Sequence, residues 1–144
     1  MAEKTEGLSQ EERDAVKDRA KELRAEAKAG KNRAAGEKAI RDAIEEQSGE
    51  DLAIAEGFYK VVSEVAPQLM PKTYYGMPAF ANAEGKVVTF MQPAAKFKAR
   101  YATIGFDDKA NLDDGDMWPT SFAVVAWTPA VEKRFSDLVA TAVS

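Results

Sequence analysis

Residues 66–92 read APQLMPKTYYGMPAFANAEGKVVTFMQ, and this stretch decides the fold. Pro67 and Pro71 end the helix that precedes them, because proline lacks an amide hydrogen and disfavours helical geometry in the residue before it. Beyond Pro71 the chain is rich in β-branched and aromatic residues separated by turn residues, a pattern typical of short strands. Five strands are predicted, at residues 73–75, 79–81, 87–92, 101–106 and 121–127.

The connections between these strands favour an antiparallel sheet. Asn82, Glu84 and Gly85 form a turn signal between two of the strands, as in a hairpin. Parallel neighbours would need a crossover of about a dozen residues or more. The link from Val88 to Ile104 is too short, and too clearly marked by proline, to hold a long helix, so we expect antiparallel pairing.

Helices are predicted before and after the sheet. Ser48 and Asp51 have the spacing of a helix start. The apolar residues that follow recur every three or four positions: Leu52, Ala55, Phe58, Tyr59, Val62 and Val65. Thr128 and Pro129 start a last helix. Its apolar stripe comprises Val131, Phe135, Leu138, Val139 and Ala142. The predicted fold class is α+β, with an antiparallel sheet of about five short strands packed against these helices.

A charged helical arm is predicted in front of this fold. Ser9 and Glu12 have capping-box spacing, which predicts a helix from about Gln10 to Ala29. Its apolar stripe comprises Val16, Ala20, Leu23 and Ala27. Burying this stripe would stabilise the arm little, because it is mostly alanine, so we expect loose docking. A second short helix is predicted around Ile40 and Ile44.

Length and composition favour one folded domain behind that arm. The chain has 144 residues, of which 45% are hydrophobic and 31% charged, enough apolar surface for a core. Every proline and nearly all of the large rings follow Ala66. We therefore place the helical arm at residues 1–45 and the α+β domain at residues 46–144.

Charge and cysteine content indicate a cytoplasmic protein. The chain has no cysteine, so it can form no disulfide framework, and a reducing compartment is expected. Residues 1–10 lack the apolar stretch of a secretory signal, and no window has the length and hydropathy of a membrane span. We therefore expect no membrane partner. The net charge of −4 gives no overall attraction to nucleic-acid phosphate, which disfavours a nucleic-acid partner except at a local basic patch.

The absence of histidine excludes several enzyme classes. Without it there is no Ser-His-Asp triad and no ordinary zinc site. No glycine-rich phosphate loop or dinucleotide fingerprint follows a predicted strand. Catalysis would have to rest on Asp, Glu, Lys or Tyr with shifted pKa values, and no spacing identifies such a pair. A non-enzymatic protein is therefore expected.

An acidic loop is the candidate metal site. Its five carboxylates, Asp107, Asp108, Asp113, Asp114 and Asp116, are hard oxygen ligands of the kind that bind calcium, magnesium or iron. Their spacing does not match an EF-hand. The alternative interpretation is a solvated loop in which these residues form turns and cap local amides.

A basic segment is the candidate anion site. Lys96, Lys98 and Arg100 alternate along the chain and would point to one side if the segment were extended. Together with Tyr75 and Trp118 they could line a cleft for an anion or a small molecule. The alternative is a solubilising stripe that pairs with the acidic loop.

The motif YYGMPAF at residues 74–80 resembles the YdhG-like family, a bacterial domain family of unknown function. The resemblance extends to QPAAKFK at 92–98 and MWPTSF at 117–122, and it covers residues 51–144. It implies a compact α+β sandwich similar in outline to frataxin. Some members are described as frataxin-like iron chaperones, which implies iron binding by acidic surface residues.

Three functional hypotheses follow. The first is a non-enzymatic YdhG-like binding protein that handles iron through the acidic loop. The second is a small-molecule or anion binder that uses Tyr75 and the basic segment. The third is an interaction module whose arm binds a protein or nucleic-acid partner through Lys28, Lys31 and Arg33.

Overall fold

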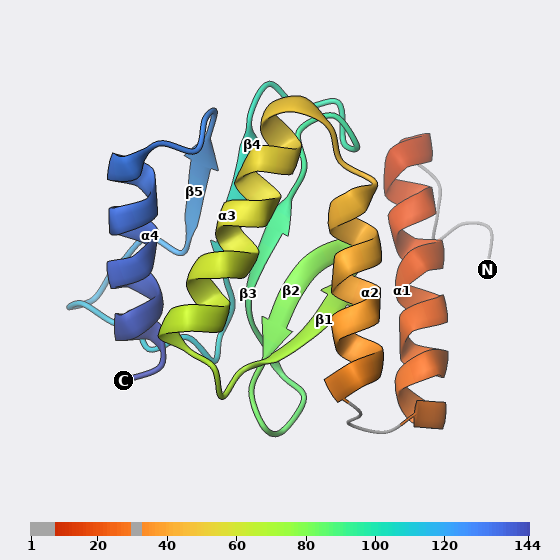
Figure 1. Cartoon of the computed structure of the whole chain (residues 1–144), viewed down its shortest axis with the longest axis horizontal. Coiled ribbons are helices and arrows are strands. Elements are labelled where there is room, and N and C mark those ends of the chain that lie inside the picture. The colour runs from red at the N-terminus through yellow and green to blue at the C-terminus, as the bar shows by residue number, and fades with distance from the viewer. Residues whose placement is uncertain (1–7, 30–32) are drawn as a thin grey trace.

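The structure is a computed structural model that describes residues 8–29 and 33–144. Within these ranges it contains four helices and five strands (Figure 1). The helices are α1 (Gln10–Ala29), α2 (Arg33–Glu45), α3 (Gly49–Val65) and α4 (Pro129–Ala142). The strands are β1 (Met70–Tyr74), β2 (Met77–Ala81), β3 (Val87–Gln92), β4 (Ala102–Phe106) and β5 (Ser121–Val124). The α+β class is confirmed, and each predicted strand is present. The bounds of β3 are as predicted, and those of the other strands differ by one to three residues.

The strands form one antiparallel sheet in the order β1-β2-β3-β4-β5. Each strand pairs with the next one along the chain, and the antiparallel pairing that the short connections predict is confirmed. The order of the strands was not predicted. Residues directly opposite one another on neighbouring strands point to the same face of a sheet. Phe80, Thr89 and Phe106 therefore share one face, which we call the core face.

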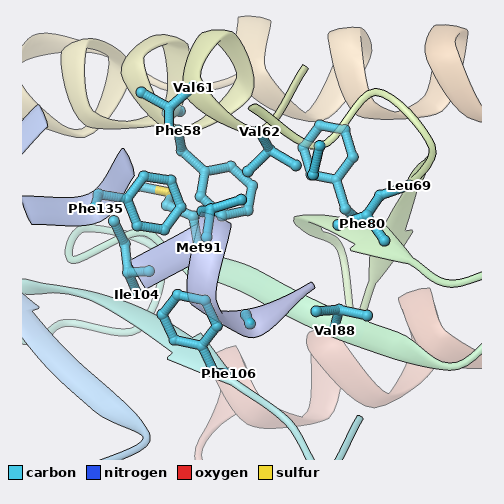
Figure 2. Packing of buried hydrophobic residues seen from close by; sticks show 14 of the residues in the cluster. Phe58, Val61, Val62, Leu69, Phe80, Val88, Met91, Ile104, Phe106 and Phe135 are labelled. Atoms are coloured by element: carbon cyan, nitrogen blue, oxygen red, sulfur yellow. The ribbon is translucent and has the colours of Figure 1, made fainter. Parts of the chain in front are cut away.

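The core lies between this face and the helices α3 and α4 (Figure 2). The Phe58 ring of α3 is 5.7 Å from that of Phe80 and 5.5 Å from that of Phe135 in α4, centroid to centroid. Ile40 and Ile44 of α2 belong to the same cluster and are 0% exposed. Burying each such side chain stabilises the fold by about 1.5–3 kcal/mol. The predicted short helix of the arm therefore contributes to the core.

The helix ends largely follow the predicted capping signals. Glu12 N donates to Ser9 Oγ at 3.1 Å, and Ser9 N donates to Glu12 Oε1 at 2.9 Å, which is a complete capping box. Thr128 Oγ1 accepts from Val131 N at 3.2 Å, with Pro129 as the first helical residue. Ser48 precedes α3 but makes no side-chain capping bond.

The second face of the sheet carries Ala79, Phe90 and Gly105 in register across β2, β3 and β4. The Phe90 ring lies against Gly105, where a Cβ atom would overlap it. The Tyr74 ring lies 5.8 Å from that of Phe90, centroid to centroid, and the Arg19 guanidinium of α1 lies over Tyr74. Helix α1 thus docks on the second face, at the end formed by β1 and β2.

Helix α1 docks through its charged side, which corrects the expectation drawn from its apolar stripe. Val16 and Leu23 are 44% and 50% exposed, while Ala15, on the charged side of the helix, is buried. The stripe is mostly alanine and offers little apolar surface, whereas the charged residues find partners at the β1–β2 turn. The structure contains no helix, in the ranges described, that is long and apolar enough to cross a membrane.

Candidate functional site

The β1–β2 hairpin closes with a two-residue loop. Tyr74 pairs with Met77, and the loop residues Tyr75 and Gly76 have φ angles of +53° and +77°. Two-residue hairpin loops favour positive φ at these positions, because it matches the twist of the strands. For a tyrosine this conformation costs about 1–2 kcal/mol. The loop holds two successive amide N–H groups outside the strand ladder.

Both amides bind one carboxylate from α1. Tyr75 N donates to Glu22 Oε1 at 2.9 Å, and Gly76 N donates to Glu22 Oε2 at 2.8 Å. The Glu22 side chain is only 10% exposed. Hydrogen bonds to a charged acceptor contribute about 1.5–3 kcal/mol each, more than neutral ones. Successive amides of a turn form an anion-binding concavity of the kind called a nest.

A second ion pair contacts the same glycine. Lys96 Nζ lies 3.2 Å from Asp18 Oδ2. A Cβ atom built on Gly76 would overlap both Lys96 Nζ and the Asp18 carboxylate. The positive φ favours glycine at this position, and a larger residue would also have to displace this ion pair. We call the Tyr75 and Gly76 amides together with Lys96 the turn site.

Arg19 covers the aromatic side of the turn site. Its guanidinium lies 5.2 Å from the Tyr74 ring centroid and 5.8 Å from that of Tyr75, a cation–π arrangement. Its Nη1 atom is 3.6 Å from Glu22 Oε1, so it also lies close to the bound carboxylate. Burial raises the pKa of Tyr74 above its usual value of 10.0, because the phenolate is poorly solvated there.

Lys98 extends the basic surface along α1. Its Nζ atom is 2.9 Å from Glu11 Oε1. The hydrogen bond from Lys98 lowers the pKa of Glu11 below its usual 4.5, and the same bond raises the pKa of Lys98 above 10.5. Both directions indicate that the charged forms of the two groups stabilise each other.

Helix α3 positions the segment that carries both lysines. Ala94 N and Ala95 N donate to Asp51 Oδ1 and Oδ2, each at 3.0 Å, and Asp51 is buried. The segment is folded into turns, and Lys98 has a φ of +53°. The prediction that residues 96, 98 and 100 alternate along an extended chain is therefore wrong, because Asp51 holds the start of the segment in a turn.

The structure brings together three of the five residues predicted for an anion site. Tyr75, Lys96 and Lys98 all contact α1. The Arg100 guanidinium instead lies 5.0 Å from the ring centroid of its neighbour Tyr101. Trp118 packs against the core cluster. The pairs that Lys96 and Lys98 make are with α1 and not with the acidic loop.

The acidic loop is spread over the surface. Asp107, Asp108, Asp113, Asp114 and Asp116 are all exposed. Asp107 accepts a hydrogen bond from the following amide, Asp108 N, at 2.9 Å. Residues 8–29 and 33–144 contain no group of three or more acidic side chains placed to hold a metal ion. In this arrangement the five carboxylates do not fit a metal ion, and their role in iron binding stays a prediction.

Of the three basic residues proposed as the binding surface of the arm, the structure describes the side chain of Arg33. Arg33 Nη1 donates to Leu69 O at 3.2 Å, so it ties the start of α2 to the segment before β1. Lys31 and the side chain of Lys28 lie outside the described residues.

A groove of about 540 Å³ lies elsewhere, on the solvent side of α3. It is lined by residues of mixed charge together with two aromatic rings, including Arg41, Glu56, Tyr59, Lys60, Trp127 and Glu132. The Trp127 indole lies against Gly57 and its Nε1 donates to Glu132 at 3.1 Å. Arg41 and Glu56 form an ion pair at 3.2 Å. These polar groups are engaged with one another.

The acidic half of the turn site was missed from sequence. Glu11, Asp18 and Glu22 are spaced by seven and four residues, which places them on one side of a helix. That spacing is a usable signal, but it identifies only a charged face and not its partner. Asp51 was assigned to the helix start, and its bonds to Ala94 and Ala95 link residues far apart in sequence.

Comparison of the chain with protein-family models, with curated proteins and with solved structures gives no match. The resemblance to the YdhG-like family therefore remains a prediction from the sequence motif, and the functional argument rests on the geometry of the site.

Proposed function

We propose that this is a non-enzymatic binding protein that recognises carboxylate groups at the turn site. The observation that carries the proposal is the pair of hydrogen bonds from Tyr75 N and Gly76 N to the two oxygens of one carboxylate. Backbone amides cannot change their charge or retract from the site. A site built from them selects for an acceptor with two oxygens in a plane, which is the shape of a carboxylate.

The charges around the amides support the same ligand class. Lys96 supplies a full positive charge next to Gly76, and Lys98 supplies a second one further along. Both lysines already contact carboxylates of α1. Electrostatic complementarity of this kind raises association rates and favours anions over neutral ligands.

The scaffold beneath the turn is rigid. All five residues of β2 are buried, and β2 pairs with strands on both sides. Asp51 holds the lysine segment from α3. A preorganised site loses little conformational entropy when a ligand binds. The cysteine-free composition supports a reducing, cytosolic setting for this binding.

The experiment uses a full-length variant whose arm has lost its carboxylates, E11A/D18A/E22A, which we call the arm variant. The labelled arm variant is titrated with glutarate, a small dicarboxylate, while the amide resonances are followed by NMR. We expect the Tyr75 and Gly76 resonances to shift and saturate, with a dissociation constant on the order of 1 mM. Glutaramide is the matched neutral control and should cause no shift.

A second titration tests whether Lys96 belongs to the site. K96Q added to the arm variant should weaken glutarate binding severalfold, because one charged contact is lost. The proposal is wrong if glutarate leaves the Tyr75 and Gly76 amides unchanged, or if sodium chloride of the same ionic strength produces the same shifts. Ferrous iron in the same assay tests the iron hypothesis through the resonances of residues 107–116.

A further inference from the structure

Helix α1 is held on the rest of the protein mainly by charged contacts at its surface. Among the side chains of residues 10–24, only Ala15 is buried. The polar contacts that hold α1 on the domain are made by charged residues: Asp18, Arg19 and Glu22 lie at the turn site, and Glu11 contacts Lys98 further along. Docking that rests on charge is reversible and is weakened by salt, because mobile ions screen partly exposed pairs.

The outward side of α1 does not hold the helix in place. Val16 and Leu23, the two large apolar residues of its stripe, point away from the domain and are 44% and 50% exposed. Release of α1 would therefore add little to the exposure of these two side chains, and on the domain it would uncover the Tyr74 and Tyr75 rings beneath Arg19. The hydrophobic effect opposes release in proportion to the apolar area that these rings and Ala15 transfer to water.

The contacts do not require α1 and the turn site to belong to the same chain. The turn site offers two amides and Lys96, and Lys98 lies further along the same surface. Together they receive three carboxylates spaced by seven and four residues on one side of a helix. A second copy of the protein carries the same helix with the same spacing. Exchange of an identical element between copies preserves every contact, which makes it a low-cost route to association.

We propose that the turn site binds α1 from a second copy of this chain, so that the natural ligand of the site is an acidic helix. This inference rests on the proposed carboxylate recognition and names the ligand that supplies the carboxylates. In the wild-type protein the attached arm competes, because a tethered segment has an effective concentration on the order of millimolar. Exchange between wild-type copies is therefore expected only at high protein concentration.

Complementation between two full-length variants removes that competition. The arm variant, E11A/D18A/E22A, keeps an intact turn site but has no carboxylates to fill it. The site variant, K96E/K98E, keeps an intact arm, but its own lysine positions now repel Asp18 and Glu11. When the two are mixed, the arm of the site variant is expected to occupy the turn site of the arm variant.

The measurement follows the labelled arm variant by NMR as the unlabelled site variant is added. We expect the Tyr75 and Gly76 resonances to return toward their wild-type positions and to saturate. Translational diffusion should slow to that of a particle of twice 15.7 kDa. The matched control is a chain with all five substitutions, which should change neither signal. If a multiple variant unfolds, the pair E22A and K96E serves in the same design.

The possible results separate the two proposals. If glutarate shifts the Tyr75 and Gly76 amides of the arm variant but an excess of the site variant does not, carboxylate recognition stands and the exchange of α1 is wrong. If neither glutarate nor the site variant shifts these amides, both proposals are wrong. Recovery of the wild-type resonances with the site variant, and not with the control chain, supports the exchange.

Discussion

One arrangement at the level of single residues occurs twice in this protein. Glu22 and Asp51 each place their two carboxylate oxygens against two successive backbone amides, at 2.8–3.0 Å. The two carboxylates act at neighbouring places, because Asp51 shapes the segment that carries Lys96 and Glu22 fills the turn site beside it. In both cases the charged acceptor satisfies donors that no strand or helix would satisfy.

Removal of the Asp51 carboxylate is expected to destabilise the fold. D51A leaves the Ala94 and Ala95 amides partly buried without their acceptor, which costs about 1–3 kcal/mol. Glu50 is the matched control, because it also lies in the acidic first turn of α3 but is exposed. Both variants lose the same favourable interaction with the helix dipole. Urea denaturation should therefore show a larger loss for D51A than for E50A, and equal losses would contradict the anchoring role.

Only some of the residues at the turn site could be identified from the sequence. Tyr75, Lys96 and Lys98 were named from sequence as candidate anion-site residues, and all three contact α1 in the structure. Their binding of an external anion stays a prediction. The role of Glu22 could not be predicted, because Glu22 belongs to no recognisable sequence motif and its partners lie 53 and 54 residues further along the chain. Charged residues on helices are usually solvated, and local spacing gives no information about distant partners.

At the level of elements, α1 shows how periodicity can indicate the wrong side of a helix. The bounds of α1 were predicted correctly, because its capping box and helix propensity are local properties. Its orientation was not, because Val16, Ala20 and Leu23 offer too little apolar area to outweigh the charged contacts on the other side. The prediction that the side chains of residues 96, 98 and 100 point to one side was wrong for a related reason. Such alternation requires an extended chain, and the bonds to Asp51 fold this segment into turns.

The docking of α1 is expected to depend on pH through Glu11. Its pKa is lowered when α1 is docked, so the Glu11–Lys98 contact contributes fully above about pH 4.5 and is lost as the pH falls through the lowered value. K98Q should raise the pKa of Glu11 toward its usual 4.5, because the hydrogen bond from Lys98 is the largest cause of the lowered pKa. Carboxyl-carbon NMR titration measures this directly.

The control for that titration is K109Q, which removes an exposed lysine from the acidic loop. It should leave the titration of Glu11 as in the wild type. An unchanged pKa of Glu11 in K98Q would mean that α1 does not lie along the basic segment in solution.

At the level of the whole molecule, the core and the turn site lie on opposite faces of the sheet. The core face could be predicted in outline, because the apolar periodicity of α3, α4 and the strands is strong (Figure 2). The short connections also predicted antiparallel pairing, but they did not predict the order of the strands in the sheet. The placement of α1 on the second face could not be predicted, since it depends on polar contacts between distant segments.

Because the turn site is separate from the core, its residues can be substituted with less effect on folding than core residues. The groups that hold α1 are side chains and amides at the end of one hairpin and the loop after β3, and they do not belong to the core cluster. Substitutions in the arm or at Lys96 are therefore expected to change binding while the fold stays intact.

The most direct test of the turn site is hydrogen exchange at two backbone amides in E22A. We predict that the Tyr75 and Gly76 amides of this full-length variant exchange about tenfold faster or more, and together, because both lose the same charged acceptor. The control is D14A, which removes an exposed carboxylate of the same helix that makes no contact with the turn in the structure and should leave both rates unchanged. Unchanged exchange at Tyr75 and Gly76 in E22A would contradict the assignment of this turn as a carboxylate site.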